Sequence, residues 1–150
     1  MAGAGPRRQA REAALQVLFA ADVSRHLVPE AVLEVFDGVL ESFSLPNRAR
    51  VRARQIVLGV AQNLKQIDES IGAASVHWKV YRLGTVDRNV LRIATFELLL
   101  EPDIPTEVIL DEALEIARRF AGERARSFIN GVLDVVARSV RPDPARPVRR

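Results

Sequence analysis

The sequence contains no cysteine, and this absence excludes several kinds of site at once. Without a thiol, no disulfide framework, thiolate metal site or cysteine nucleophile can form. A cysteine-free chain also fits a reducing compartment, so we expect a cytoplasmic protein. The amino-terminal segment has no uncharged apolar run, because Glu12, Gln16 and Asp22 interrupt it. We therefore predict neither a targeting segment nor a membrane span.

Histidine is scarce as well, and the motifs of common catalytic sites are missing. His26 and His77 fall in predicted loops, and neither has a second histidine at the spacing that binds a metal. No phosphate-binding loop, GxGxxG or GxSxG motif occurs. Glu112 and Glu115 share one predicted helix, but no histidine completes a metal-binding pair. We expect no enzyme activity, cofactor, bound metal or small-molecule substrate.

The residues that are present have the balance of an ordinary folded domain. The chain has 150 residues, of which 48% are hydrophobic and 27% are charged. Apolar residues recur with helical spacing from Arg8 to Arg138, and no alternating, strand-like segment occurs. The sequence therefore predicts an all-α fold.

Breaks in the helical pattern divide the chain into its predicted helices. These cover residues 8–23, 30–43, 48–71, 86–100, 107–121 and 123–138, with a short turn of helix around 78–82. Thr85 and Thr106 are predicted N-caps, and Gly122 is predicted to take the left-handed conformation between the last two helices. Gly131 is expected either to permit a close helix crossing or simply to be tolerated.

The short connections predict one helical domain over residues 1–140, with six to seven helices in two groups. The first group covers about residues 7–73 and the second about residues 78–140, and they meet near the connection from Gly72 to Gly84. Residues 141–150 contain three prolines and little to bury. We predict a disordered basic tail there, whose arginines, beginning with Arg141, raise non-specific affinity for nucleic acid.

Positive charge is carried mainly by arginine, and it gathers at the start of the first helix. Arg7, Arg8 and Arg11 fall within an arc of about 100° on a helical wheel. They share the side of the apolar residues Leu15 and Leu18. We interpret this as opening turns that project beyond the bundle and offer guanidinium groups to an anion, with a solvated face as the alternative. Such a cluster favours RNA or DNA.

Other charged and aromatic residues give weaker signals. The third predicted helix opens with Arg48, Arg50, Arg52 and Arg54, which project to two sides and favour a solvated face. Between Glu97 and Glu115 the chain carries seven acidic residues and no basic residue. This acidic segment is suited to a basic protein partner, although solvation explains it equally well. Phe19, near the arginine cluster, is the best candidate for stacking on a base.

Three stretches of the sequence resemble, in order, the motifs of the NusB family of transcription antitermination factors. They are RRQAREAALQVLF, WKVYRLGTVDRNVLRIATFELL and DIPTEVILDEALEIARRFAGERARSFINGVLD. The match runs from Arg7 to about Ala137, and residues 23–51 are unremarkable. The resemblance implies an all-helical fold of two three-helix bundles.

The resemblance also implies a function and its partners. Members of the family pair with NusE, a ribosomal small-subunit protein. The pair binds the boxA element of nascent ribosomal RNA and supports the RNA polymerase antitermination complex. The RNA-contacting helix start corresponds to Arg7, Arg8 and Arg11, and Phe19 stands where the family has tyrosine or phenylalanine.

The NusE-facing surface of the family corresponds to other positions of this chain. One is Asp87, at the start of the fourth predicted main helix. The others surround the last turn and are Phe120, Arg124 and Phe128. Arg124 stands where the family often has an acidic residue, and we expect it to contact RNA.

Two other functions stay open on the residues alone. One is a stand-alone RNA-recruiting domain, related to the domain that precedes the catalytic part of ribosomal RNA cytosine methyltransferases. The other is a role in ribosome assembly, in which the acidic segment acts as a chaperone for a basic ribosomal protein.

Overall fold

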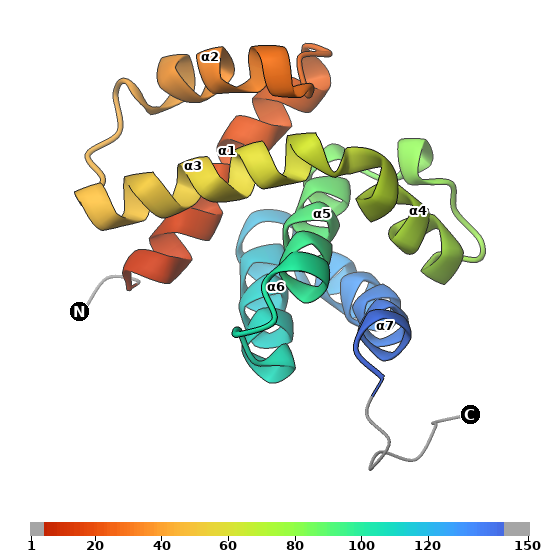
Figure 1. The fold of residues 1–150 in the computed structure, drawn as a ribbon. Coiled ribbons are helices and arrows are strands. Elements are labelled where there is room, and N and C mark those ends of the chain that lie inside the picture. Colours follow the sequence, from red (N-terminus) through yellow and green to blue (C-terminus); the bar gives the residue numbers. More distant parts are fainter. Residues whose placement is uncertain (1–4, 143–150) are drawn as a thin grey trace.

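A computed structural model describes residues 5–142, and within that range the chain is all helical (Figure 1). The elements are α1 (Pro6–Val23), α2 (Pro29–Leu40), α3 (Asn47–Gln62), α4 (Leu64–Ala74), a short 3-10 helix η1 (Val80–Arg82), α5 (Thr85–Leu100), α6 (Thr106–Ala121) and α7 (Glu123–Val140). The predicted all-α class is confirmed. Across the described residues, no helix has the length and apolar character needed to cross a membrane.

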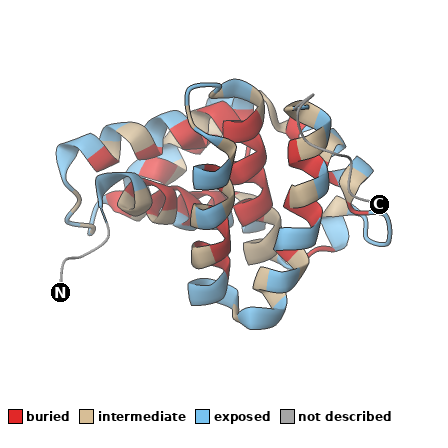
Figure 2. Ribbon diagram, turned by 90° about the horizontal axis from the view of Figure 1, so that it is seen from below, coloured by how far each residue is buried: buried red, intermediate tan, exposed pale blue. Residues whose placement is uncertain are grey.

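Helix α5 lies at the centre of the molecule and contacts α1, α3, α4, α6 and α7 (Figure 1). Every residue from Asn89 to Leu98 is buried. The sequence explains this position, because apolar residues occupy all sides of α5, as is typical of a helix surrounded by others. Figure 2 shows the same division elsewhere, with buried residues where helices face one another and exposed residues on the outside.

The remaining helices form two groups around α5. Helices α1, α2 and α3 pack on one another, and α6 packs on α7. Helix α4 packs mainly against α5 and α7, although the predicted boundary near residue 73 placed it in the first group. Judged by the contacts between helices, the boundary between the two groups lies at Asn63, between α3 and α4.

The prediction of one continuous helix over residues 48–71 is wrong. The backbone leaves the helical region at Asn63, where φ is −121° and ψ is 22°. The side-chain amide of Asn63 donates a hydrogen bond of 2.8 Å to the Gly59 carbonyl oxygen. This local bond competes with the helix ladder. The apolar pattern does not reveal the break, because Val60 and Ile67, on either side of it, are both buried.

The predicted helix caps are corrected in part. Helices α5 and α6 begin at Thr85 and Thr106 themselves, and neither threonine side chain caps a helix. Acidic residues in the first turns, Asp87 and Glu107, favour these helix starts electrostatically. Gly122 has a positive φ of 93°, so the predicted need for glycine between α6 and α7 is confirmed.

Arg141, placed in the disordered tail by prediction, is instead fixed to the end of α5. Its guanidinium donates hydrogen bonds of 2.6–3.1 Å to the backbone carbonyl oxygens of Glu97, Leu98, Glu101 and Ile104. The last carbonyl groups of a helix have no partner within it, so a cation here satisfies them. Arg141 is therefore structural, and the other tail arginines, Arg146, Arg149 and Arg150, lie outside the described residues.

A cluster of ions joins the carboxyl end of α1 to the rest of the molecule. The Asp22 carboxylate accepts hydrogen bonds from Arg88, Asn89 and Arg92 of α5, at 2.8–3.0 Å. Burial by itself raises the pKa of Asp22, but these hydrogen bonds and the arginine charges outweigh it and lower the pKa. Arg92 also donates to both carboxylate oxygens of Asp68 on α4, at 2.9 Å. The cluster thus links α1, α4 and α5.

Close packing of α3 on α5 depends on Gly59. A Cβ atom at Gly59 would lie 2.3 Å from Cε1 of Phe96. A Cβ atom added at Gly131, by contrast, would meet nothing within 4 Å. The close crossing expected at Gly131 is therefore wrong, and simple tolerance of the glycine is correct.

We predict opposite effects for alanine at these two glycines. Gly59→Ala should lower the free energy of unfolding by about 1–3 kcal/mol, because the methyl group forces Phe96 to move in a packed core. Gly131→Ala should be neutral or raise it by up to about 1 kcal/mol, because alanine favours helix. Urea denaturation of both variants measures this difference, and equal effects would contradict the assigned crossing.

Candidate nucleic-acid interface

The three arginines of the predicted patch have different environments. Arg7 is exposed and Arg8 is partly exposed. Arg11 is only 3% exposed. The wheel correctly placed Arg11 on the packing stripe of α1, but the prediction that its guanidinium projects from the bundle is wrong. The physical reason is a carboxylate that meets it inside the molecule.

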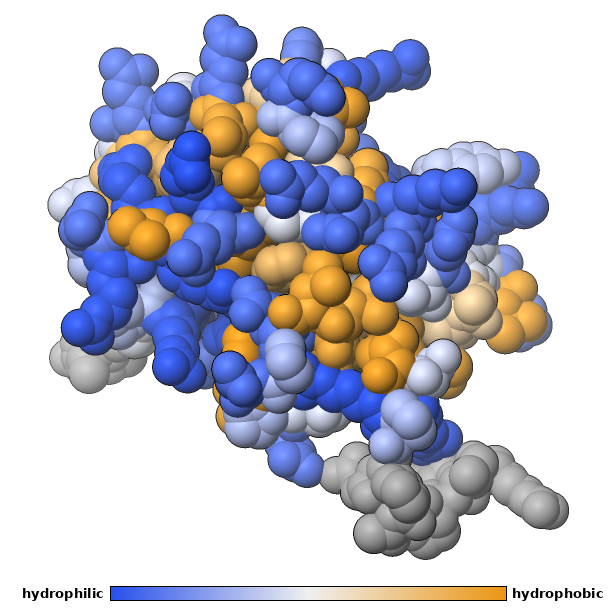
Figure 3. Space-filling view, in the orientation of Figure 1, coloured by the Kyte–Doolittle hydropathy of each residue, from blue (hydrophilic) through white to orange (hydrophobic). Residues whose placement is uncertain are grey.

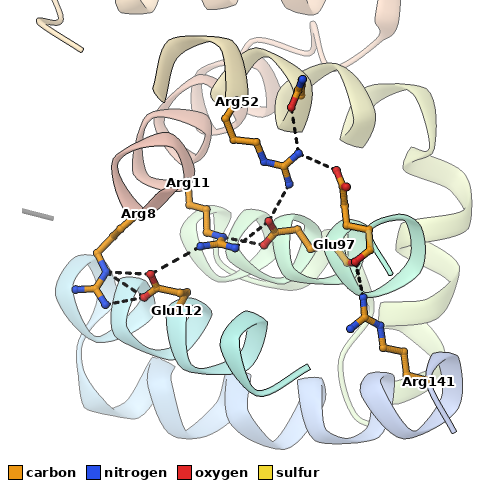
Figure 4. Close-up of polar contacts among 8 residues, drawn as sticks. Arg8, Arg11, Arg52, Glu97, Glu112 and Arg141 are labelled. Atoms are coloured by element: carbon orange, nitrogen blue, oxygen red, sulfur yellow. Dashed lines mark hydrogen bonds and ion pairs between the residues drawn. The ribbon is translucent and has the colours of Figure 1, made fainter. Parts of the chain in front are cut away.

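Glu97, on the buried helix α5, is the partner of Arg11 (Figure 4). Nε of Arg11 donates to Oε1 of Glu97 at 2.8 Å, and Nη2 donates to Oε2 at 3.1 Å. The two side chains are 4% and 1% exposed. This is a bidentate ion pair, in which two N–H groups of the planar guanidinium each bind one oxygen of the carboxylate. It also neutralises a charge that burial alone would strongly disfavour.

Arg52 of α3 completes the neutralisation from the other side of Glu97. Its Nη2 donates to Oε2 of Glu97 at 3.0 Å, and its Nη1 donates to Glu101 at 2.8 Å. Glu112 of α6 lies 3.7 Å from Nη1 of Arg11. The network therefore joins α1, α3, α5 and α6, as the dashed lines of Figure 4 trace.

Arg8 is held at the surface by Glu112 without being enclosed. Its Nε and Nη2 atoms donate to the Glu112 carboxylate at distances of 2.6–3.3 Å. The hydrogen bond with Glu112 raises the pKa of Arg8, against the opposing effect of burial. The Arg8 side chain stays 36% exposed. One edge of its guanidinium can therefore still contact a ligand.

Much of the predicted acidic segment is used inside the molecule. Glu97, Glu101 and Glu112 all bind arginines of α1 or α3. Three of the seven acidic residues in that segment are thus partners of arginines at the starts of α1 and α3. The sequence held a signal for this, because Glu97 lies in the apolar run ATFELLL and needs a cation wherever that run is buried.

Ion pairs between side chains also join α6 to α1. Arg8, near the start of α1, pairs with Glu112 in the middle of α6, and Glu12 pairs with Arg119 near the end of α6, at 2.8 Å. Arg124 is exposed and lies in the first turn of α7, directly after the turn at Gly122 that ends α6. Phe19, on α1, is 41% exposed, as stacking on a base requires.

The residues predicted to face a protein partner lie partly together. Asp87 and Phe128 line one hollow of about 230 Å³, whose other walls are Trp78, Arg82, Leu83 and Gly84. Burial raises the pKa of Asp87. Within residues 5–142 its carboxylate has no ion pair or hydrogen bond from a side chain. Phe120 does not line this hollow; it is 41% exposed, and the Arg119 guanidinium lies 5.7 Å from the centre of its ring.

The two histidines lie in connections between helices, as predicted, and both are exposed. Over the described part of the chain, no three histidine, cysteine or acidic side chains are grouped so that they could hold a metal ion.

Comparison with known proteins identifies the family. The NusB family model matches residues 8–138. The transcription antitermination protein NusB of Sorangium cellulosum is 42% identical over 136 residues, which cover 91% of this chain and 94% of that protein. The structure of T. maritima NusB has a TM-score of 0.82 at 39% identity, covering 93% of this chain and 96% of that one.

A crystal structure of the antitermination factors NusB and NusE in complex with dsRNA is also similar. Its matching chain has a TM-score of 0.78 at 26% identity, with coverage of 89% of this chain and 97% of that one. The class of protein is thus an all-helical antitermination factor. The chain belongs to the NusB family, as its three sequence motifs predicted.

We predict that the buried pair is needed for folding. Glu97→Gln should lower the free energy of unfolding by about 3–5 kcal/mol, because Arg11 loses most of its compensating charge while it stays buried. Glu115→Gln is the matched control, since Glu115 pairs with Arg118 at the surface. The control should unfold close to wild type. Denaturation curves for both variants measure the effect, and a stable Glu97→Gln protein would show that the pair is dispensable.

Proposed function

We propose that this chain is a transcription antitermination factor that binds boxA-type RNA together with NusE, within the RNA polymerase antitermination complex. Membership of the NusB family supports this role. So does the likeness to a chain in the NusB, NusE and dsRNA crystal structure. The observation that carries the proposal is the exposed arginine at the opening turn of α1, beside an otherwise neutralised cluster. Such a role is cytoplasmic and requires no catalytic group.

The proposed RNA surface follows the outer side of α1. Arg7 and the open edge of Arg8 supply phosphate contacts, and Phe19 supplies an aromatic face for a base. Arg124 adds a cation in the first turn of α7. Arg11 is left out, because its guanidinium is buried and already bonded to Glu97. Its role is to fix the start of α1, so that Arg7 and Arg8 are presented in one place.

The proposed partner surface is built around Asp87. Other half-buried carboxylates of the chain, such as Asp22 and Glu112, bind arginines within the molecule. Asp87 has no such partner among the described residues, although its hollow is walled by the aromatic rings of Trp78 and Phe128. A lysine or arginine of NusE fits this setting, with its stem on the rings and its charge on Asp87. Phe120 extends the surface as a separate apolar contact.

The comparisons favour antitermination over the two other functions considered above. The Sorangium cellulosum relative carries an antitermination name and is covered over 94% of its length, which supports that role above an RNA-recruiting domain of a methyltransferase. A chaperone role rests on a free acidic surface. Three carboxylates of that segment, those of Glu97, Glu101 and Glu112, are already bound to arginines.

Arg7→Ala tests the RNA surface. The loss of one phosphate contact should weaken binding of a single-stranded boxA RNA by about 1 kcal/mol, or about fivefold. The slope of log K against log salt should become shallower by about 0.7. Fluorescence anisotropy over a salt series measures both quantities. Unchanged affinity and slope would remove Arg7 from the interface.

Asp87→Asn tests the partner surface, because it keeps the shape of the side chain and removes its charge. Affinity for purified NusE should fall by about 2 kcal/mol, or roughly 30-fold, in isothermal titration calorimetry. The free protein should be about as stable as wild type, because burial disfavours the charged form of Asp87 while its place at the start of α5 favours it.

Asp37→Asn is the control for this experiment. Asp37 is an exposed carboxylate on α2, which packs on α1 and α3. If both substitutions leave NusE binding unchanged, Asp87 does not receive the partner's cation.

A further inference from the structure

A basic hollow lies between the starts of α1 and α3, on a side that sequence patterns assigned to solvent. It has a volume of about 350 Å³ and is lined by Pro6, Arg7, Arg11, Arg48, Arg52, Glu101 and Ile104. A second hollow of about 530 Å³ adjoins it and shares Pro6, Arg7 and Arg48. Figure 3 shows that hydrophilic side chains crowd this part of the surface, next to the amino-terminal end of the described chain.

The arginines of the hollow divide into a neutralised floor and a charged rim. Arg11 and Arg52 donate to Glu97 and Glu101, so their charges are largely offset. Arg7 and Arg48 are exposed, and neither has a hydrogen bond or ion pair from its side chain within residues 5–142. The hollow therefore has a rigid base and two guanidinium groups with unused donors at its rim.

The α3 arginines have distinct roles for the same reason. Arg50 donates to the backbone carbonyl oxygens of Leu40 and Phe43, at 3.3 and 3.2 Å, and so fixes the connection from α2. Arg52 belongs to the Glu97 network. Arg48 and Arg54 are both exposed, but only Arg48 lines the hollow.

We propose that Arg48 and Arg7 together bind one phosphodiester group of an RNA strand, which thereby continues from α1 onto the start of α3. The inference rests on the proposed RNA-binding function and extends its surface to a helix that the family motifs did not include. Two guanidinium groups facing one opening suit a phosphate, which accepts several charge-assisted hydrogen bonds. The apolar side chains of Pro6 and Ile104 leave room for a sugar or base beside it. The two hollows in series favour a strand over a single free anion.

The test compares Arg48→Ala with Arg54→Ala, a matched exposed arginine on the same helix. Binding of the single-stranded boxA RNA is measured by fluorescence anisotropy between about 0.05 and about 0.3 M salt, with NusE present and absent. Arg48→Ala should make the slope of log K against log salt shallower by about 0.7, whereas Arg54→Ala should leave it unchanged. Thermal unfolding of both variants should match wild type, because both side chains are exposed.

A second measurement asks whether Arg7 and Arg48 hold the same phosphate. The double variant Arg7→Ala with Arg48→Ala should lose less affinity than the two single losses multiplied together, because they share one ligand group. RNAs with one neutral methylphosphonate linkage locate that group. One linkage should weaken wild type and Arg54→Ala, weaken Arg48→Ala less, and have no further effect on the double variant.

The outcomes separate the two levels of the proposal. If wild type binds the RNA and Arg7→Ala weakens it, but Arg48→Ala behaves like Arg54→Ala, this inference is wrong and the proposed function stands. A further outcome is that inorganic phosphate shifts the NMR signals of the Arg48 side chain while Arg48→Ala keeps full RNA affinity. In that case the hollow binds a free anion, and the inference is also wrong. If wild type does not bind the RNA with or without NusE, the proposed function fails and this inference fails with it.

Discussion

The carboxylate of Glu97 is buried in the middle of the molecule, and the positions of the surrounding helices depend on neutralising it. Arg11 of α1 and Arg52 of α3 meet it from two sides. The same central helix carries a buried cation, Arg92, which binds Asp22 of α1 and Asp68 of α4. The buried helix α5 therefore carries two charged residues, Glu97 and Arg92, and each needs residues of opposite charge from the neighbouring helices. The ion pairs of these two residues fix α1 against α5 near both ends of α1. Apolar contacts are non-directional, so they define the position of a helix less precisely.

This constraint divides the arginine cluster between helix packing and the proposed RNA surface. Arg11 is buried and paired with a carboxylate of α5, and Arg8 is partly buried and paired with a carboxylate of α6. Arg7 lies at the beginning of α1, beyond that reach, and stays exposed. The buried members hold the exposed one in place. A guanidinium held on a fixed helix start loses less conformational freedom on binding than one on a flexible tail.

Much of the fold could be predicted from the sequence, since helical periodicity located most helices and Gly122 marked the turn between α6 and α7. Periodicity failed at Asn63, where a side-chain hydrogen bond ends α3 while the apolar pattern continues. The family motifs pointed to Arg7, Arg8 and Arg11 together, but a helical wheel shows only which side of a helix a residue occupies. It does not show that α5 and α6 cover that side at Arg11. A lone glutamate in an apolar run was the available signal. The sequence held no signal for the hollow shared by Arg7 and Arg48, because that hollow brings together residues from separate helices.

Arg11 has a structural role in the buried ion pair, and we propose that the exposed Arg7 binds RNA. Hydrogen exchange of the arginine Nε–H groups, followed by NMR during an RNA titration, tests this assignment in one experiment. We expect the Arg11 Nε–H to be protected in the free protein and unchanged by RNA, whereas the Arg7 Nε–H should exchange rapidly until RNA is added and then become protected. Rapid exchange at Arg11 in the free protein, followed by protection on RNA addition, would contradict this assignment.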